Sequence, residues 1–309
     1  MNLNTVVGDH LLSSTDGNGK LCLLLSHDTA VYEPILCDLI GQLLKSPVAA
    51  LGAVVVPPSA SGSSSGDCSA SMEHVVPANR CLLITTQKSS RMYAQFLTQF
   101  LKTHSSGHSE LITVSVAEWA QGVLAGMSNA DGFLSPFTPE FGNALLRHIQ
   151  TEIDKFLSTT SSGLGTKETV AIENLTALLD MGLTPRELER LLTRLIRPAP
   201  PKSATGRIPR RLVLVGCHVG NNYTDPFASD LEPAWVHCLE FLKARSSLIL
   251  EVRSLATGYT ASVDGELSIT EPQPISARKD TASVTRLFHY RCEAKRVMCY
   301  PPGTSNLVT

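Results

Sequence analysis

Gly17, Gly19 and Lys20 are residue types that hold phosphate in nucleotide hydrolases. There, a glycine-rich loop follows a buried strand and ends in lysine and serine or threonine. In this sequence the glycines and the lysine precede the first apolar run, 21–25, and so lie on the wrong side of it. The segment after the run, 26–35, contains neither glycine nor lysine. We interpret 17–20 as a turn that leads into the first strand, and we expect no triphosphate-binding loop.

Glu173 ends another short apolar run, 170–172. Nucleotide hydrolases carry a carboxylate at such a place, where it helps to hold Mg²⁺. Without a lysine loop, this carboxylate has no bound phosphate to act on. We therefore expect Glu173 and Asn174 to cap a helix or to accept hydrogen bonds from a loop.

The segment Gly216–Gly220 follows a strand-like run and is the candidate for a dinucleotide-type turn. Its spacing is GxxxG rather than GxGxxG, and no acidic residue ends a strand about 20 residues later. A nucleotide- or S-adenosylmethionine-binding enzyme that uses this turn is the rival hypothesis. Asn221 and Asn222 indicate a long loop after the strand, and such loops carry binding residues in α/β sheets. We treat both asparagines as candidate contacts with RNA or a partner protein.

The remaining histidines and cysteines do not form a convincing site. His104 and His108 are four residues apart, but they lie in a serine- and glycine-rich stretch rather than on a helix face. Cys217 and His218 are adjacent on a strand, so their side chains point to opposite faces. His237 lies in an apolar helical segment. We therefore predict no catalytic residue, no metal site and no cofactor, and hence a chain that is not an enzyme.

One set of charges has a regular spacing. Four arginines recur at helical intervals opposite a row of leucines, and together they cover a sector of roughly 80°. They are Arg186, Arg190, Arg194 and Arg197, and the following segment adds Lys202, Arg207, Arg210 and Arg211. Guanidinium groups in a row suit phosphate recognition, and the absence of neighbouring aromatic side chains limits such contact to the nucleic-acid backbone. A solvated helix face is the alternative interpretation.

The elements that would position these residues alternate along the chain. Apolar runs typical of buried strands occur at 20–26, 81–85, 111–117, 169–173, 211–217 and 247–253. Helical periodicity is found at 31–45, 89–101, 139–157, 174–182, 184–197 and 231–244. Three short alternating runs follow, at 267–270, 287–291 and 296–300, and they indicate a β-meander. This order predicts an α/β fold with a mostly parallel twisted sheet, helices on both faces and a C-terminal antiparallel meander.

Composition sets the limits of this interpretation. The chain has 309 residues, of which 43% are apolar and 17% charged, so it can form a packed core. Its net charge of −2 excludes a globally basic nucleic-acid binder. No apolar stretch reaches the roughly 20 residues of a membrane span, and no secretory signal opens the sequence. Eight scattered cysteines without a CxxC pair indicate reduced intracellular thiols. We expect one domain, 1–309, with a disordered serine- and glycine-rich insertion at about 57–79.

The C-terminal third resembles the Elongator complex protein 6 family. In that family, an apolar strand leads into a Leu-x-Thr-Gly-Phe/Tyr turn, and a Val-x-Gly-x-Leu hairpin follows. The matching residues here are Leu255, Thr257, Gly258, Tyr259, Val263, Gly265 and Leu267. The later strands contribute Tyr290, Lys295 and Val297. Weaker likeness extends to 19–25 and 173–182, while Glu173-Asn174 in place of an acidic pair and the serine-rich insertion depart from the family pattern.

The resemblance implies a RecA-like domain that lacks the phosphate-binding loop. It implies assembly with the fourth and fifth Elongator subunits into a hetero-hexameric ring that joins the remaining Elongator subunits. Such a ring binds tRNA, releases it in a manner linked to ATP, and supports the modification of wobble uridines. The expected location is the cytoplasm, with the nucleus as a second compartment. A RecA-like partner in DNA recombination complexes is a further hypothesis that the residues leave open.

Overall fold

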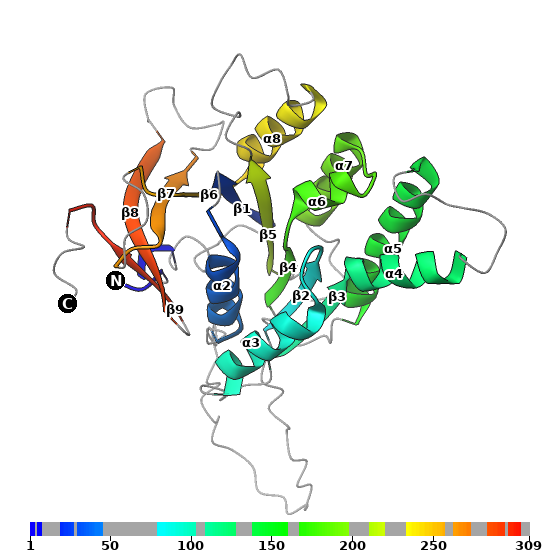
Figure 1. The fold of residues 1–309 in the computed structure, drawn as a ribbon, viewed down its shortest axis with the longest axis horizontal. Coiled ribbons are helices and arrows are strands. Elements are labelled where there is room, and N and C mark those ends of the chain that lie inside the picture. Colours follow the sequence, from blue (N-terminus) through cyan, green and yellow to red (C-terminus); the bar gives the residue numbers. More distant parts are fainter. Residues whose placement is uncertain are drawn as a thin grey trace, which may run out of the picture.

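The computed structural model describes residues 1–3, 5–7, 19–27, 30–45, 79–102, 109–127, 138–159, 167–197, 210–219, 233–256, 262–272, 283–293 and 296–303. Within these ranges, nine strands form one sheet with helices packed against it (Figure 1). None of the helices described there is long and apolar enough to cross a membrane.

Six strands form the parallel part of the sheet. They are β1 (Lys20–His27), β2 (Arg80–Thr85), β3 (Glu110–Ser115), β4 (Lys167–Ile172), β5 (Arg210–Val219) and β6 (Leu248–Arg253). The sheet order is β3-β2-β4-β5-β1-β6-β7-β8-β9, so β1 lies between β5 and β6 and pairs in parallel with both. The meander consists of β7 (Gly265–Glu271), β8 (Val284–Glu293) and β9 (Arg296–Tyr300), which pair antiparallel. The predicted α/β class, a mostly parallel sheet with helices on both faces that ends in an antiparallel meander, is confirmed.

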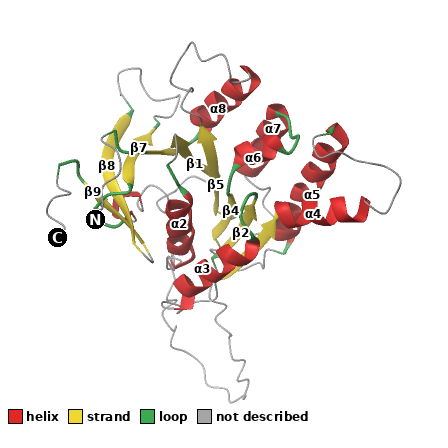
Figure 2. Ribbon diagram, in the orientation of Figure 1, coloured by secondary structure: helices red, strands yellow, loops and turns green. Residues whose placement is uncertain are grey.

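Helices cover both faces of the parallel strands (Figure 2). One face packs against α2 (Glu33–Lys45) and α3 (Ser90–Lys102). The other packs against α4 (Val116–Met127), α5 (Pro139–Ser158), α6 (Leu175–Asp180), α7 (Pro185–Ile196) and α8 (Pro233–Arg245). Cys22 and Leu24 of β1 enter the first core, and Leu21, Leu23 and Leu25 enter the second. Because β1 is buried on both sides, its sequence is a continuous apolar run without alternation.

Two predicted boundaries were wrong. The run 111–117 was expected to be a strand throughout, but the strand ends at Ser115 and helix α4 begins at Val116. The hydroxyl of Ser115 accepts a hydrogen bond from the amide of Glu118, which caps the first turn of α4. This helix was missed because it is apolar almost throughout, with Glu118 as its charged residue, so it has no polar face to reveal a helical period. The strand expected to end at Cys217 continues to Val219.

A row of alternating charges crosses the amino ends of four neighbouring strands. Glu110, Arg80, Glu168 and Arg211 are register neighbours on β3, β2, β4 and β5. The Nε of Arg80 lies 2.6 Å from a carboxylate oxygen of Glu110, and Nη2 of Arg211 lies 3.3 Å from one of Glu168. Both guanidiniums also donate to carbonyls near helix ends, that of Phe156 in α5 and that of Leu195 in α7. These contacts place positive charge at the negative ends of two helices and fix how they meet the sheet.

The predicted insertion of 57–79 lies outside the described residues except for Asn79. This asparagine is buried, and its Nδ2 donates to the carbonyls of Leu43 and Leu44 at 3.0 and 3.3 Å. Those carbonyls belong to the last turn of α2, so Asn79 caps the helix that precedes the insertion. Asn79 therefore lies beside the end of α2, although 34 positions separate it from Lys45.

Candidate functional site

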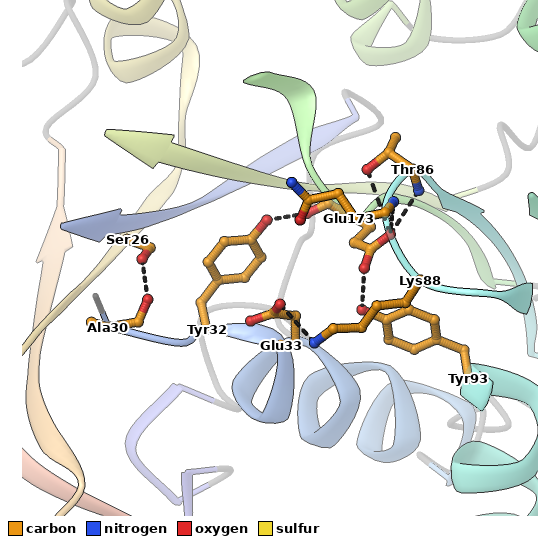
Figure 3. Close-up of polar contacts among 9 residues, drawn as sticks. Ser26, Ala30, Tyr32, Glu33, Thr86, Lys88, Tyr93 and Glu173 are labelled. Atoms are coloured by element: carbon orange, nitrogen blue, oxygen red, sulfur yellow. Dashed lines mark hydrogen bonds and ion pairs between the residues drawn. The ribbon is translucent and has the colours of Figure 1, made fainter. Parts of the chain in front are cut away.

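The carboxyl ends of the parallel strands are where α/β sheets place their ligands, and here the ends of β1, β2, β4 and β5 come together. Figure 3 shows the side chains at this edge of the sheet. Glu173 directly follows β4, Thr86 follows β2, and Tyr32 directly precedes α2. The cluster formed by Tyr32, Thr86, Gln87, Tyr93 and Glu173 is called the edge cluster below.

Glu173 is the centre of the edge cluster and is fully buried. Its Oε2 accepts hydrogen bonds from the backbone amides of Thr86, at 2.6 Å, and Gln87, at 3.0 Å. Its Oε1 accepts from the hydroxyl of Tyr93 at 2.7 Å. Both carboxylate oxygens are therefore engaged within the chain. The predicted role of Glu173, a hydrogen-bond acceptor for a loop, is confirmed.

Asn174 has the other predicted role. Its Oδ1 accepts hydrogen bonds from the amides of Thr176, at 3.0 Å, and Ala177, at 3.4 Å, so it is the N-cap of α6. An asparagine at this position satisfies amides that the helix cannot bond internally. At the end of β4, Glu173 therefore holds the loop after β2, and Asn174 caps α6.

Tyr32 packs over Gly216 and His218 of β5. Its side chain is fully buried, and its hydroxyl donates to the main-chain carbonyl of Glu173 at 2.5 Å. Its ring lies 4.9 Å, between centroids, from that of His218. Burial raises the pKa of the Tyr32 hydroxyl, and the nearby Cys217, Glu33 and Glu173 raise it further. The hydroxyl therefore stays protonated and acts as a donor.

Gly216 is a strand residue and not part of a turn. It lies within β5, in register with Leu24 of β1. A Cβ at this position would overlap the carbonyl oxygen of Glu173 and would lie 2.5 Å from Cε2 of Tyr32. The glycine is thus explained by the close approach of Tyr32 and Glu173 to β5, and the reading of Gly216 as the first residue of a cofactor-binding turn was wrong. Gly220, Asn221 and Asn222 lie outside the described residues.

Helix α2 begins with an acidic side chain, that of Glu33. A helix that binds an anion would instead leave its first backbone amides free for the ligand. Glu33 lies in the first turn of α2, and its carboxylate forms an ion pair with Nζ of Lys88 at 2.8 Å (Figure 3). The amino end of a helix has a partial positive charge, which favours anions. Here a side chain of the chain supplies that anion. Between β1 and α2, the hydroxyl of Ser26 also donates to the carbonyl of Ala30.

Among the described residues, the thiols lack the features of a nucleophile. Cys217 packs in the core against α8, whereas His218 contacts Tyr32, so the expected separation of these neighbours on opposite faces is confirmed. Burial raises the pKa of Cys217. Desolvation likewise raises the pKa of five further thiols to about 12, namely Cys22, Cys37, Cys238, Cys292 and Cys299. A reactive thiolate at neutral pH needs the opposite shift.

The arginine stripe lies on the outer face of α7. Its members Arg186, Arg190, Arg194 and Arg197 are all exposed, while Leu188, Leu191, Leu192 and Leu195 are buried. Thr184 and Glu187 form a capping box at the start of the helix. Nη2 of Arg194 lies 2.7 Å from Asp154 on α5, whereas the other three arginines form no ion pair with the described residues. Three of the four stripe arginines are therefore exposed cations without an acidic partner among the described residues.

The other predicted contact residues have different environments. The guanidinium of Arg211 is engaged by Glu168 and by the carbonyl of Leu195, and its side chain is 10% exposed, so it is unsuited to binding RNA. Arg210 begins β5 at an N-terminal strand end, and Arg207 lies outside the described residues. His104 and His108 are also outside them, while the exposed His237 lies 3.3 Å from Glu189. Among the described residues, no group of three histidine, cysteine or acidic side chains could hold a metal ion.

The residues that carry the family resemblance are described only in part. Leu255 is described just after β6, and Gly265 opens β7, whereas Thr257, Gly258 and Tyr259 lie outside the described residues. A Cβ on Gly265 would lie 2.6 Å from the carbonyl oxygen of Arg253 and 2.8 Å from Cε1 of Tyr290. The glycine therefore lets β6 and the ring of Tyr290 approach the start of β7.

Sequence reasoning found Glu173 but missed its partners Tyr32, Thr86 and Tyr93. These contacts join residues 141, 87 and 80 positions apart, so no local spacing could reveal them. The available signal was a tyrosine close after a buried strand, where nucleotide hydrolases carry a glycine loop.

No family model matches this chain, and no curated protein matches it either. Among solved structures, it is similar to an uncharacterized protein from Pyrococcus horikoshii in complex with an unknown peptide, with 14% identity and a TM-score of 0.45 over 96% of each chain. It is also similar to a DnaB-like replicative helicase, described with its interactions with primase, at 8% identity and a TM-score of 0.39 over 96% of this chain and 67% of the helicase. These values are too low to support any statement about function.

Proposed function

We propose that this chain is a non-catalytic structural subunit of the Elongator complex, related to the Elongator complex protein 6 family. In this proposal it assembles with the fourth and fifth Elongator subunits into a hetero-hexameric ring that binds tRNA and supports wobble-uridine modification. Its place of action would be the cytoplasm, with the nucleus as a second compartment.

The non-catalytic part of the proposal rests on the hydrogen bonds within the edge cluster. Tyr32 packs over Gly216 of β5. Glu173, which would face a metal in a hydrolase, is fully buried with both oxygens engaged by Thr86, Gln87 and Tyr93. Phosphoryl transfer needs donors and a metal arranged around an open phosphate position. Here both oxygens of the Glu173 carboxylate already accept hydrogen bonds from the chain itself, which supports a role without hydrolysis.

The Elongator assignment rests on the sequence resemblance around the meander. Gly265, one of the matched positions, opens β7 where β6 and Tyr290 leave no room for a side chain. The meander extends the parallel sheet by three strands, so the two edges of the domain differ in kind. Domains with two different lateral surfaces can assemble head to tail and close into a ring, which supports the proposed arrangement.

The arginine stripe on α7 supports contact with RNA. Arg186, Arg190 and Arg197 are exposed and form no ion pair within the described part of the chain. Guanidinium groups of this kind bind phosphates through several hydrogen bonds each. Since no stacking aromatic side chain belongs to the stripe, we propose that it contacts the tRNA backbone and does not read bases.

Affinity purification of the full chain, with its bound proteins quantified by mass spectrometry, tests the assignment. We expect the fourth and fifth Elongator subunits in amounts equal to this chain. Recovery of DNA recombination factors in their place would contradict the proposal. Titration of the isolated chain with Mg-ATP and with S-adenosylmethionine tests the non-catalytic part separately, and saturable binding of either at micromolar concentration would contradict it.

A further inference from the structure

The loop Thr86–Lys88 has the geometry of an anion-binding site. Two consecutive backbone amides, those of Thr86 and Gln87, both donate to Oε2 of Glu173, and the Thr86 hydroxyl lies 3.5 Å from the same oxygen. Successive amides that converge on one point form a concave positive site of the type that binds phosphates and carboxylates. The loop therefore binds an anion already, and that anion belongs to the chain.

The surroundings of the loop add to its positive character. Helix α3 begins at Ser90, directly after the loop, so the loop lies at the positive end of that helix. Tyr93, in the first turn of α3, donates its hydroxyl to the second oxygen of the carboxylate. Burial, and then the hydrogen bond to Glu173, raise the pKa of Tyr93, so this donor stays protonated. The carboxylate thus receives donors on both oxygens from the β2–α3 segment.

We propose that Thr86–Lys88 is an anion-binding loop whose permanent ligand is the carboxylate of Glu173. The bound carboxylate links the end of β4 to the β2–α3 loop and to α3, while the Glu173 carbonyl holds Tyr32 in front of α2. One residue therefore sets the positions of both helices on this face at the carboxyl edge. This inference does not depend on the proposed Elongator role, because it concerns contacts of Glu173 within this chain.

The variant Glu173→Ala tests the proposal directly. The substitution removes a CH₂–COO⁻ group, which has nearly the size and charge of acetate. We expect the amides of Thr86 and Gln87 to exchange hydrogen about tenfold to hundredfold faster in the variant, because hydrogen bonds to a charged acceptor are lost. We expect added sodium acetate to slow their exchange again, whereas sodium chloride at the same ionic strength does not. Amide-resolved hydrogen exchange on the full chain measures both effects.

Glu33→Ala is the matched control. It removes a carboxylate from the same edge, but Glu33 pairs with Nζ of Lys88 and accepts no bond from the two amides. We expect the exchange of Thr86 and Gln87 in this variant to be insensitive to acetate, because Glu173 still accepts from both amides. The proposal is overturned if Glu173→Ala leaves the two amides as protected as before, or if acetate has no more effect on it than on Glu33→Ala.

Glu173→Gln keeps the test available if the alanine variant does not fold. The amide side chain fills the same volume, yet it has no charge and one acceptor oxygen. We expect a folded protein in which the two loop amides exchange several-fold faster than in the unchanged chain. Unchanged exchange would show that the loop does not need an anion, and would overturn the proposal.

Discussion

Tyr32 donates its hydroxyl to the main-chain carbonyl of Glu173 at 2.5 Å, and the two residues are 141 positions apart. This bond crosses the edge of the sheet directly over Gly216, whose missing side chain leaves the space for it. The contact joins α2, β4 and β5 at the place where related architectures hold ligands. It makes the carboxyl edge of this sheet a packed region with its own internal partners.

Gly216→Ala should destabilise the fold. The added methyl group would overlap the Glu173 carbonyl and the Tyr32 ring, and overpacking of this kind costs about 1–3 kcal/mol. Gly122→Ala is the matched control, because a Cβ at Gly122 in α4 meets nothing within 4 Å. We expect it to be neutral or stabilising by up to about 1 kcal/mol, since alanine favours helices. Urea unfolding of both variants decides the matter, and equal midpoints would show that Gly216 is not needed for space.

Glu168→Gln should be strongly destabilising, and Asp154→Asn should not. The side chains of Glu168 and Arg211 are 1% and 10% exposed, so removing one charge leaves the other buried without compensation, at about 3–5 kcal/mol. The side chains of Asp154 and Arg194 are 50% and 55% exposed, and this surface pair should contribute about 0–1 kcal/mol. Free energies of unfolding from denaturant titration at pH 7 measure the difference. Comparable losses for the two variants would refute the role assigned to burial.

The double variant Arg186→Glu/Arg190→Glu should weaken tRNA binding by the proposed ring. Each phosphate contact that is lost should also reduce the slope of log K against log salt by about 0.7–0.9. Arg147→Glu is the control, because Arg147 is an exposed arginine on α5 and outside the stripe. Binding is measured at several salt concentrations, together with the mass of the assembly. A ring that forms normally and binds tRNA with unchanged slope would remove the stripe from the binding surface without touching assembly.

The fold should lose stability at alkaline pH. Desolvation raises the pKa of the Cys22 thiol from 9.0 to about 12. Between these values the unfolded chain releases the proton and the folded chain keeps it, so this stabilisation is complete below pH 9 and is lost as the pH rises toward 12. The slope for one such thiol is about 1.4 kcal/mol per pH unit. We expect Cys22→Ala to flatten the decline between pH 9 and 11 by about that amount, whatever its stability at pH 7; an unchanged slope would contradict the assignment.

Asn79→Ala should cost about 1–3 kcal/mol, because the carbonyls of Leu43 and Leu44 lose their buried donor. Replacement of 57–78 by a short glycine–serine linker, with Asn79 kept, tests the expectation of a disordered insertion. We expect that replacement to change the free energy of unfolding by less than about 1 kcal/mol, since loop length acts only logarithmically. Thermal unfolding of the two variants gives the comparison. A large loss on replacement would mean that 57–78 contributes to the packed domain.

Much of the fold could be read from local patterns. The apolar run of β1 predicted a strand buried on both faces, and the leucine and arginine periodicity of α7 predicted which side of that helix is buried. The capping role of Asn174 followed from its place before a helical segment. These features depend on neighbours in the chain, and the helical and strand periods express them directly. Helix α4 was not predicted, because its nearly uniform apolar composition has no helical period.

The residues along the chain thus specified the strands, most helices, the order of parallel and antiparallel elements and the lack of a glycine loop after β1. The roles of Arg211, Gly216 and Tyr32 were decided in space. The sequence suggested Arg211 as a surface contact, yet its register opposite Glu168 gives it a structural ion pair. Gly216 was a candidate turn residue, yet it lies in a strand where Tyr32 leaves no room for a side chain. Strand order and register set such neighbours, and contacts between residues more than forty positions apart, as these are, leave no trace in sequence spacing.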